Sequence, residues 1–285
     1  MNALELHKVN KTYRDFTLKD VSFTLPEGSI MGFVGENGAG KTTTIKLILN
    51  LIQRQSGSIK LFGLDNIKDE KRVKEQLGVV FDESYFHGNL RPMDVARIMK
   101  NIYRNWDDKL FARYLETFKL PVGKMLKEYS KGMKMKLSIA TALAHHPRFL
   151  ILDEATSGLD PVVRNEIMDI FLDFIQDERH AILLSSHITS DIERIADYIT
   201  FIHEGEIVFS ESKDRLLDEY GSMHCTARDL DRIDSELIVG SRVSQFGCEA
   251  LVRDKRMMRN RFRGLVIDDA TLEAIMLFYV RGESK

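Results

Sequence analysis

Cysteine is scarce in this sequence, which contains only Cys225 and Cys248 among its 285 residues. Neither belongs to a Cys-x-x-Cys pair, and no pair of histidines accompanies them, so their spacing does not match a zinc site. A disulfide framework is also disfavoured, because such frameworks need several cysteines in a small secreted domain. We therefore expect two unpaired, small core residues in a reducing compartment.

The sequence also lacks a strong charge imbalance and long apolar runs. Its formal net charge of −2 gives no overall attraction to nucleic acid or to anionic lipid. No stretch reaches the roughly 18 uninterrupted apolar residues of a membrane-spanning helix. The first residues, MNALELHKVNKTY, scatter acids and bases and lack the apolar segment of a signal peptide. We expect a cytoplasmic protein, and docking onto a membrane protein stays open.

Internal repeats and low-complexity segments are absent, and strand-like stretches alternate with helix-like ones. Short apolar or alternating runs predict strands, whereas a period near 3.6 predicts helices. The predicted strands are 3–13, 18–25, 29–35, 57–63, 76–82, 148–155 and 180–187, with a hairpin over 197–211. The predicted helices are 42–52 and 162–178, together with most of 90–146. This order indicates an α/β domain with a largely parallel core sheet, and the early strands should form an antiparallel layer beside it.

The alternation stops near residues 221–223, and residues 222–285 read as a separate charged piece. The piece contains RDKRMMRNRFR at 253–263 and ends near ATLEAIMLFYVRG. The basic run fits a nucleic-acid or lipid patch in isolation, but the surrounding acids balance its charge. A solvated basic face on a small appended region is the better interpretation.

A glycine-rich loop is the first chemical signal. GENGAGKT, residues 35–42, fits G-x-x-x-x-G-K-[ST] between a strand-like run and a helix. Its glycines permit backbone angles closed to other residues, so N–H groups can turn toward phosphate oxygens at the positive end of a helix. We expect Lys41 to reach the β- and γ-phosphates of a nucleotide and the Thr42 hydroxyl to face Mg²⁺.

A buried strand that ends in two acids is the second signal. FLILDEATSGLDP, residues 149–161, brings Asp153 to the carboxyl end of a strand, where ligands bind in open α/β sheets. Asp153 can hold Mg²⁺ through water, and Glu154 can polarise a water that attacks the γ-phosphate. An acidic turn after a strand is common by itself, but together with the glycine-rich loop the pair indicates the second half of a nucleotide site.

The stretch YSKGMKMKLSIATAL, residues 129–143, predicts a helix with an unusual beginning. Ser130 would cap it, but Gly132 weakens the first turn and lysines crowd an end that is already positive. These features favour an approach by a negative group from outside the subunit.

Taken together, the motifs resemble the nucleotide-binding subunit of an ATP-binding-cassette (ABC) transporter over residues 2 to about 220. The resemblance implies a P-loop NTPase fold with a RecA-like core sheet, an antiparallel β subdomain, a helical subdomain over about 84–147 and a small C-terminal extension. It identifies 35–42 as the Walker A loop, FLILDE as Walker B, His187 as the switch histidine that senses the γ-phosphate, and Tyr13 as the aromatic that stacks on adenine. Residues 1–221 would form the ATPase domain and 222–285 an accessory region.

The resemblance also implies a set of site residues. Glu154 and His187 would be catalytic, and Thr42, Asp153 and Asp82 would lie at Mg²⁺. The nucleotide-binding residues would be Tyr13, Gly35, Glu36, Asn37, Gly38, Ala39, Gly40, Lys41, Thr42 and Thr43. The D-loop would be Ser157, Gly158, Leu159 and Asp160. The family's LSGGQ signature would be Ser130, Lys131, Gly132 and Met133, pointing at ATP held by a partner cassette in a head-to-tail dimer.

Three positions depart from the family pattern. Lys131 replaces the first signature glycine, Met133 replaces the glutamine, and Asp82 stands where the family usually has the Q-loop glutamine. Lys131 adds positive charge near the phosphate of the partner's ATP. Similar changes occur in cassettes that work with separate export-type (ABC-2-like) membrane subunits, so we expect an exporter.

The expected function is therefore MgATP hydrolysis that drives a separate membrane permease, on the inner face of the cell membrane and without nucleic acid. A homodimer and a pair with a related cassette both stay open. The alternative is an ABC ATPase of regulation, repair or translation. The repair type needs a long heptad coiled coil between the loop and the signature, and the translation type needs two cassettes, and the sequence has neither.

Overall fold

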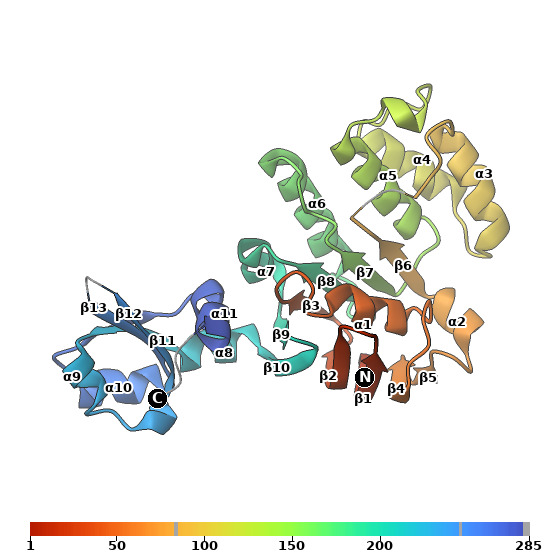
Figure 1. Cartoon of the computed structure of the whole chain (residues 1–285). Coiled ribbons are helices and arrows are strands. Elements are labelled where there is room, and N and C mark those ends of the chain that lie inside the picture. The colour runs from red at the N-terminus through yellow and green to blue at the C-terminus, as the bar shows by residue number, and fades with distance from the viewer. Residues whose placement is uncertain (83–84, 245–246, 282–285) are drawn as a thin grey trace.

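The computed structural model describes residues 1–82, 85–244 and 247–281. Figure 1 shows three sheets with helices around them. The strands are β1 (Asn2–Thr12), β2 (Thr17–Pro26), β3 (Ser29–Val34), β4 (Ser56–Leu61), β5 (Leu64–Asp65), β6 (Leu77–Val80), β7 (Phe149–Asp153), β8 (Ala181–Ser186), β9 (Tyr198–His203), β10 (Glu206–Ser212), β11 (Gly221–Cys225), β12 (Ile238–Ser244), β13 (Gly247–Val252) and β14 (Val266–Asp269).

Helices cover the sheets and connect their strands. They are α1 (Lys41–Ile48), α2 (Glu70–Lys74), α3 (Pro92–Ile102), α4 (Asp108–Thr117), α5 (Lys131–Leu143), α6 (Pro161–Phe174), α7 (Thr189–Ile195), α8 (Lys213–Glu219), α9 (Ala227–Leu230), α10 (Lys255–Arg261) and α11 (Leu272–Arg281). Short 3₁₀ helices cover Leu126–Glu128 and Ser235–Leu237. In the described part of the chain, no helix is long and apolar enough to cross a membrane.

The central sheet carries the functional edge of the molecule. Its strand order is β10-β9-β3-β8-β7-β6, with every pair parallel except the β9–β10 hairpin. Every residue of β7 and β8 is buried, which confirms the two predicted parallel core strands. The register pairs Val34 with Ser186 and Asp153 with Ser185, so the carboxyl ends of β3, β7 and β8 meet at one edge. Ligands bind at such an edge in open α/β sheets.

The predicted antiparallel layer is also present. It is a four-stranded sheet of order β2-β1-β4-β5. The prediction that the strand at 29–35 belongs to this layer was wrong, because β3 pairs in parallel with β8 and β9 in the central sheet. The β9–β10 hairpin turns at Glu204 and Gly205, which both have positive φ, as the Glu-Gly pair predicted.

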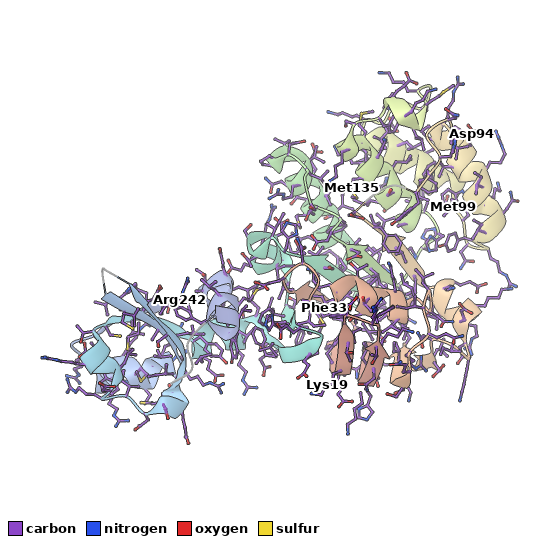
Figure 2. All side chains as sticks on the ribbon, viewed as in Figure 1. Lys19, Phe33, Asp94, Met99, Met135 and Arg242 are labelled. Atoms are coloured by element: carbon purple, nitrogen blue, oxygen red, sulfur yellow. The ribbon has the colours of Figure 1, made fainter. Side chains whose placement is uncertain are left out.

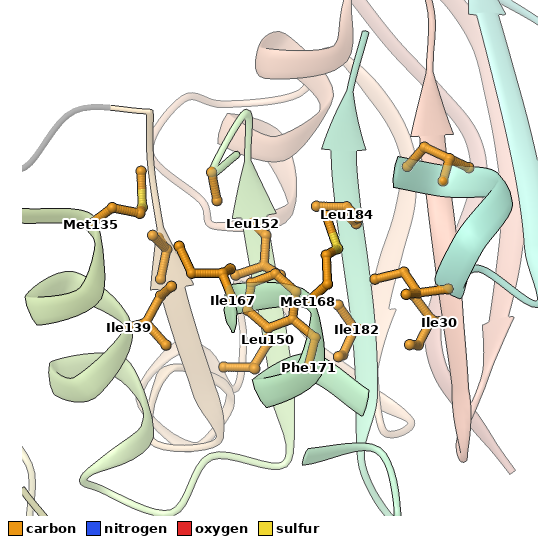
Figure 3. Packing of buried hydrophobic residues seen from close by; sticks show 14 of the residues in the cluster. Ile30, Met135, Ile139, Leu150, Leu152, Ile167, Met168, Phe171, Ile182 and Leu184 are labelled. Carbon is orange, nitrogen blue, oxygen red and sulfur yellow. The ribbon is translucent and has the colours of Figure 1, made fainter. Parts of the chain in front are cut away.

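Both faces of the central sheet are buried, because successive side chains of each strand point to opposite sides. Figure 3 shows Leu150 and Leu152 of β7 facing α6, with Met135 and Ile139 of α5 beside them. The alternate residues of β7, Phe149 and Ile151, belong to a second cluster that includes the apolar residues of α1. Each such side chain contributes about 1.5–3 kcal/mol by burial, so the sheet is a rigid base for the loops at its edge.

The segment between β6 and β7 is helical, as predicted. In Figure 1, α3, α4 and α5 form a lobe beyond β6, and Figure 2 labels Asp94 and Met99 of α3 and Met135 of α5 there. Pro92 begins α3, and the Asp107 carboxylate caps α4 by accepting from the Lys109 and Leu110 N–H groups.

The last part of the chain forms a sheet of order β12-β13-β11-β14, and its small core is made of residues such as Met223, Ala250 and Met258. The final helix, α11, also packs against the first part of the chain. Ile275 and Phe278 of α11 are buried in the same cluster as Ile192 of α7. The appended region is therefore held to the first part of the chain by its terminal helix.

Candidate functional site

The glycine-rich loop connects β3 directly to α1. Gly40 has φ of 117°, a left-handed angle that glycine adopts without strain, and Gly35 lies so close to β9 that a Cβ would come within 2.4 Å of the Ile202 carbonyl oxygen. The crest of the loop, residues 36–38, is exposed, whereas Ala39 and Gly40 are buried. The sequence therefore folds into a loop with exposed backbone at the start of a helix, which suits an anion.

Lys41 is the buried cation of this loop. It is only 6% exposed, and its ammonium donates to the carbonyl oxygens of Gly35 at 2.7 Å and Glu36 at 3.3 Å. The same nitrogen lies 3.5 Å from Glu154 Oε1. The positive charge is thus held beneath the loop, between the strand-end carboxylate and the exposed backbone.

Asp153 stands at the tip of β7 and is 5% exposed. Burial raises the pKa of its carboxyl group, and the nearby Glu154 and Asp82 carboxylates raise it further, while hydrogen bonds with the Ser185 and Thr42 hydroxyls act in the opposite direction. Its Oδ1 is buried without a hydrogen-bond partner. An orphaned carboxylate oxygen beside a hydroxyl, in a negative environment, is a fit for a divalent cation.

A cavity of about 360 Å³ joins these groups. Its lining includes Thr42, Asp82, Asp153 and Glu154. Within the described residues, no cluster of three or more His, Cys, Asp or Glu side chains is arranged to hold a metal. A Mg²⁺ ion here would therefore need further oxygen ligands from water or from phosphate.

Glu154 follows Asp153 with an unusual backbone, because its φ is 54° in a residue other than glycine. Its N–H donates to the Ser185 carbonyl oxygen at 3.1 Å, which turns the side chain across the sheet edge. Its Oε2 lies 2.6 Å from Nδ1 of His187, the residue that follows β8. The structure thus brings together the two predicted catalytic residues, and Lys41 contacts the second carboxylate oxygen.

The predicted signature begins α5, which lies in the helical lobe. Ser130 is its N-cap, and the Ser130 hydroxyl accepts from the Met133 N–H at 3.2 Å. A Cβ at Gly132 would lie 3.3 Å from Val163, so glycine also lets the first turn approach α6.

The predicted D-loop links β7 to α6. Gly158 has φ of 66°, and the Lys131 ammonium lies 2.8 Å from the point where a Cβ on Gly158 would stand. Leu159 is buried, and Asp160 caps α6 by accepting from the Val162 and Val163 N–H groups at 3.1 and 3.0 Å. The predicted D-loop therefore lies against Lys131 of the same subunit.

Tyr13 lies in the turn between β1 and β2, and it is 44% exposed. Lys11 Nζ is 5.4 Å from its ring centroid. The same turn reaches the glycine-rich loop, because the Phe16 ring lies 3.0 Å from the position of a Cβ on Gly40. Tyr13 is therefore partly exposed, in a turn whose Phe16 ring packs against the loop.

Two polar residues beside this site were not singled out from the sequence. Thr156 and Asp191 are 0% and 6% exposed, and the Thr156 hydroxyl donates to Asp191 Oδ2 at 2.9 Å. One signal for Asp191 exists in the sequence, because it lies only four residues after His187. Nothing in the sequence marks Thr156 as buried.

The edge of the sheet therefore combines a loop for phosphates, a buried cation, a carboxylate suited to a metal, and a carboxylate–histidine pair. This combination can bind a polyphosphate, neutralise its charge and orient a water for attack on it.

A scan against protein-family models matches residues 18–157 to the family described as ABC transporter. The bacitracin transport ATP-binding protein BcrA of Bacillus licheniformis is 37% identical over 190 residues, which are 66% of this chain and 62% of that protein. The lantibiotic transport ATP-binding protein SrtF of Streptococcus pyogenes is 32% identical over 213 residues, or 74% of this chain and 91% of that protein.

Solved structures agree on the fold. A structure described as the ATP-binding subunit of an ABC transporter has a TM-score of 0.68 and 26% identity, and the match covers 75% of this chain and 91% of the other. A dimeric, post-hydrolysis ATP-binding cassette bound to ADP and Pi has a TM-score of 0.66 and 21% identity, with 73% and 98% covered. The predicted α/β cassette fold is thereby confirmed.

Proposed function

This chain belongs to the ABC transporter family as an ATP-binding subunit that hydrolyses ATP, and on that premise we propose that it works as one half of a head-to-tail pair that drives a separate membrane permease. The observation that carries the proposal is the convergence of Lys41, Asp153, Glu154 and His187 at one edge of the central sheet.

ATP binds with its phosphates in the 35–42 loop and its adenine on Tyr13. The loop's residues, Gly35, Glu36, Asn37, Gly38, Ala39, Gly40, Lys41, Thr42 and Thr43, surround the phosphates with N–H groups and one ammonium. The Lys41 ammonium moves from the carbonyl oxygens of Gly35 and Glu36 to the β- and γ-phosphates. Binding thus replaces a weak internal partner with a strongly charged one.

Asp153, Thr42 and Asp82 would hold Mg²⁺. The fit rests on the unpartnered Oδ1 of Asp153 and on the Thr42 hydroxyl beside it. When bound, the ion neutralises charge on the phosphates. Asp153 is buried and fixed at a strand tip, so this chain supplies a preorganised anchor rather than a flexible one.

Glu154 is the general base of the proposed reaction. In the structure its carboxylate is shared between Lys41 and His187. A γ-phosphate competes for both of these donors, because each donates more strongly to a phosphate oxygen. Glu154 is then free to accept a proton from the attacking water, while His187 donates to the γ-phosphate.

A second subunit completes the site. Ser130, Lys131, Gly132 and Met133 open α5 without an acid in the first turn, so the positive end of the helix is unopposed. They would face the γ-phosphate of ATP held by the partner, with Ser157–Asp160 beside them. The partner is a second copy or a related cassette.

A permease is the third component. Three apolar residues of α3, Met93, Ile98 and Ile102, are 52%, 43% and 62% exposed, and Tyr85, before this helix in the chain, is 77% exposed. Such a surface favours a protein partner. Because BcrA and SrtF are named for bacitracin and lantibiotic transport, we infer an export-type permease, with this subunit on the inner face of the cell membrane and no role for nucleic acid.

Residues 1–221 would be the ATPase domain, with its helical subdomain over about 84–147, and 222–285 an accessory region. The repair-type alternative has no support in the described helices, since the longest has 14 residues and none is a long coiled coil.

Glu154→Gln tests the proposed chemistry. An amide cannot take the proton, so we expect turnover to fall by about 10²–10⁴-fold while nucleotide binding is kept. Phosphate release from ATP measures the first and calorimetry the second. Glu116→Gln, on the exposed face of α4, is the matched control and should behave as the parent. A Glu154→Gln variant that hydrolyses ATP at the parent rate would remove Glu154 as the base.

A further inference from the structure

Asp191 is a buried carboxylate that the proposed chemistry does not use. It lies in α7, four residues after His187 in the chain, and is 6% exposed. Its Oδ2 accepts a 2.9 Å hydrogen bond from the hydroxyl of Thr156, which is fully buried in the turn two residues after Glu154. A buried carboxylate is costly unless it is paired and hydrogen-bonded, so its position needs an explanation.

A second partner comes from α6. Arg164 Nη1 lies 3.9 Å from Asp191 Oδ1, and Arg164 Nη2 donates to the Leu159 carbonyl oxygen at 3.4 Å. Asp191 therefore contacts the turn after Glu154 directly and reaches the 157–160 loop through Arg164.

The helix that carries Asp191, α7, packs closely against β3 of the central sheet. A Cβ on Gly32 of β3 would lie 2.3 Å from Ile192 Cγ2, so Ile192 packs into the space that the glycine leaves. Ile192 is fully buried. With Ile192 on the sheet and Asp191 on the Thr156 turn, α7 is fixed on two sides directly after His187.

The two contacts between α7 and the Glu154 turn differ in character. The Glu154–His187 bond is at the surface, where the His187 side chain is 47% exposed, and it must open when both residues turn to ATP and water. The Thr156–Asp191 bond is buried, and breaking it would leave a carboxylate oxygen without a donor, which is strongly unfavourable. The buried bond therefore persists while the surface bond opens.

We propose that Asp191 is a positioning residue for hydrolysis: by holding Thr156, it keeps His187 and Glu154 at a fixed separation while their direct bond opens. The proposal rests on the roles of Glu154 and His187 given above. Asp191 would act on the orientation of His187 and Glu154. Its loss should therefore lower kcat and leave the affinity for ATP unchanged.

Thr156→Val is the sharpest test, because valine has nearly the same shape and lacks the hydroxyl. We expect kcat to fall by about 10–100-fold, the value of one hydrogen bond to a charged group, with the Kd for ATP unchanged within about threefold. Thr156→Ser keeps the donor and should restore most of the rate. Thr141→Val is the matched control, since Thr141 is also buried and also loses one hydrogen bond, to the Leu137 carbonyl oxygen, but away from the site.

A double-mutant cycle identifies the partner. Asp191→Ala removes the same bond from the other side, so the Thr156→Val and Asp191→Ala double variant should be about as slow as Asp191→Ala alone. Asp191→Asn keeps an acceptor for Thr156 and should be slowed less, which covers the case in which Asp191→Ala fails to fold.

Three outcomes would overturn the proposal: a parental kcat in Thr156→Val, an equal loss of kcat in Thr141→Val, or effects that multiply in the double variant. Measuring Glu154→Gln in parallel distinguishes a failure of the proposed function from a failure of the proposal for Asp191. If Glu154→Gln hydrolyses ATP normally, the assigned base is wrong. If it is inactive and Thr156→Val is normal, only the role of Asp191 fails.

Discussion

The sheet edge and the C-terminal region differ in whether their polar side chains have hydrogen-bond or ion-pair partners. At the sheet edge, Asp153 Oδ1 is buried without a hydrogen-bond partner. In the C-terminal region, the basic run at 253–263 is paired: Lys255 and Arg259 reach Asp269, and Arg256 reaches Asp218. Over the described residues, every buried side-chain polar atom without a partner lies between residues 27 and 203.

Asp153 lines the cavity that Thr42, Asp82 and Glu154 share, so its unpartnered oxygen indicates where a ligand is needed. Buried polar groups without partners are uncommon and often mark a place that an ion or substrate completes. Charges that already pair at the surface need no further partner and contribute little to stability. The contrast supports a nucleotide site at the sheet edge and a solvated face on the appended region.

The largest effect on nucleotide binding should come from Lys41. Replacing Lys41 with Ala removes a buried ammonium whose charged hydrogen bonds to phosphate are worth about 1.5–3 kcal/mol, so we expect ATP affinity to fall by about 10–150-fold. Calorimetric titration with MgATP checks this. Lys60→Ala, an exposed lysine of β4, is the control. Unchanged affinity in Lys41→Ala would show that phosphates do not lie at this loop.

The next effect tests how separate the two regions are. Ile275 of α11 is fully buried against the first part of the chain, so Ile275→Ala should cost about 2–5 kcal/mol. Trp106, the single tryptophan, reports on the helical lobe. We expect the urea midpoint of its fluorescence to fall in Ile275→Ala and to stay the same in Met258→Ala, which opens a cavity only in the small C-terminal core. Equal shifts would mean that the whole chain unfolds as one unit.

A smaller effect concerns the metal. Burial raises the pKa of Asp153, and the Asp82 carboxylate contributes to that rise. A proton therefore competes with Mg²⁺ at a higher pH than it does at an ordinary carboxylate. In Asp82→Gln the pKa of Asp153 falls, so inhibition of the ATPase by acid should shift to lower pH, while half-maximal activity at neutral pH should need more Mg²⁺. Rates measured over Mg²⁺ concentration at several pH values check both, and no change in either would place Asp82 away from the metal.

The smallest effect should lie in the paired surface charges. Arg256 and Asp218 form an ion pair at 2.7 Å with side chains 73% and 63% exposed. Arg256→Gln should change the free energy of unfolding by less than about 1 kcal/mol and leave ATPase activity as in the parent. A large loss of activity would show that the basic run takes part in function.

Much of the fold followed from local pattern. The strands that hold the site, β3, β7 and β8, are apolar runs that end in glycine or polar residues, and such runs read clearly as buried parallel strands. The return of α11 to the cassette could not be predicted, because its apolar residues fit either core equally well. Only the position of α7 beside it decides which core they enter.

The site was predictable where a motif fixes neighbouring residues and less so where the chain must fold to join them. The glycines of 35–40 and the acids at 153–154 are read directly from spacing. The hydrogen bond between Thr156 and Asp191 joins residues 35 positions apart, so neither segment predicts it by itself. The contact of Lys131 with the 157–160 loop is hidden for the same reason.

The mass of the Glu154→Gln variant with and without MgATP, measured by light scattering after size exclusion, tests the central claim most directly. A γ-phosphate gripped by Lys41 of one subunit and the Ser130 helix of the other predicts a dimer with MgATP and a monomer without it. Adding Ser130→Arg should abolish the dimer while ATP binding remains. A monomer in saturating MgATP, or a dimer that Ser130→Arg leaves intact, would contradict the account.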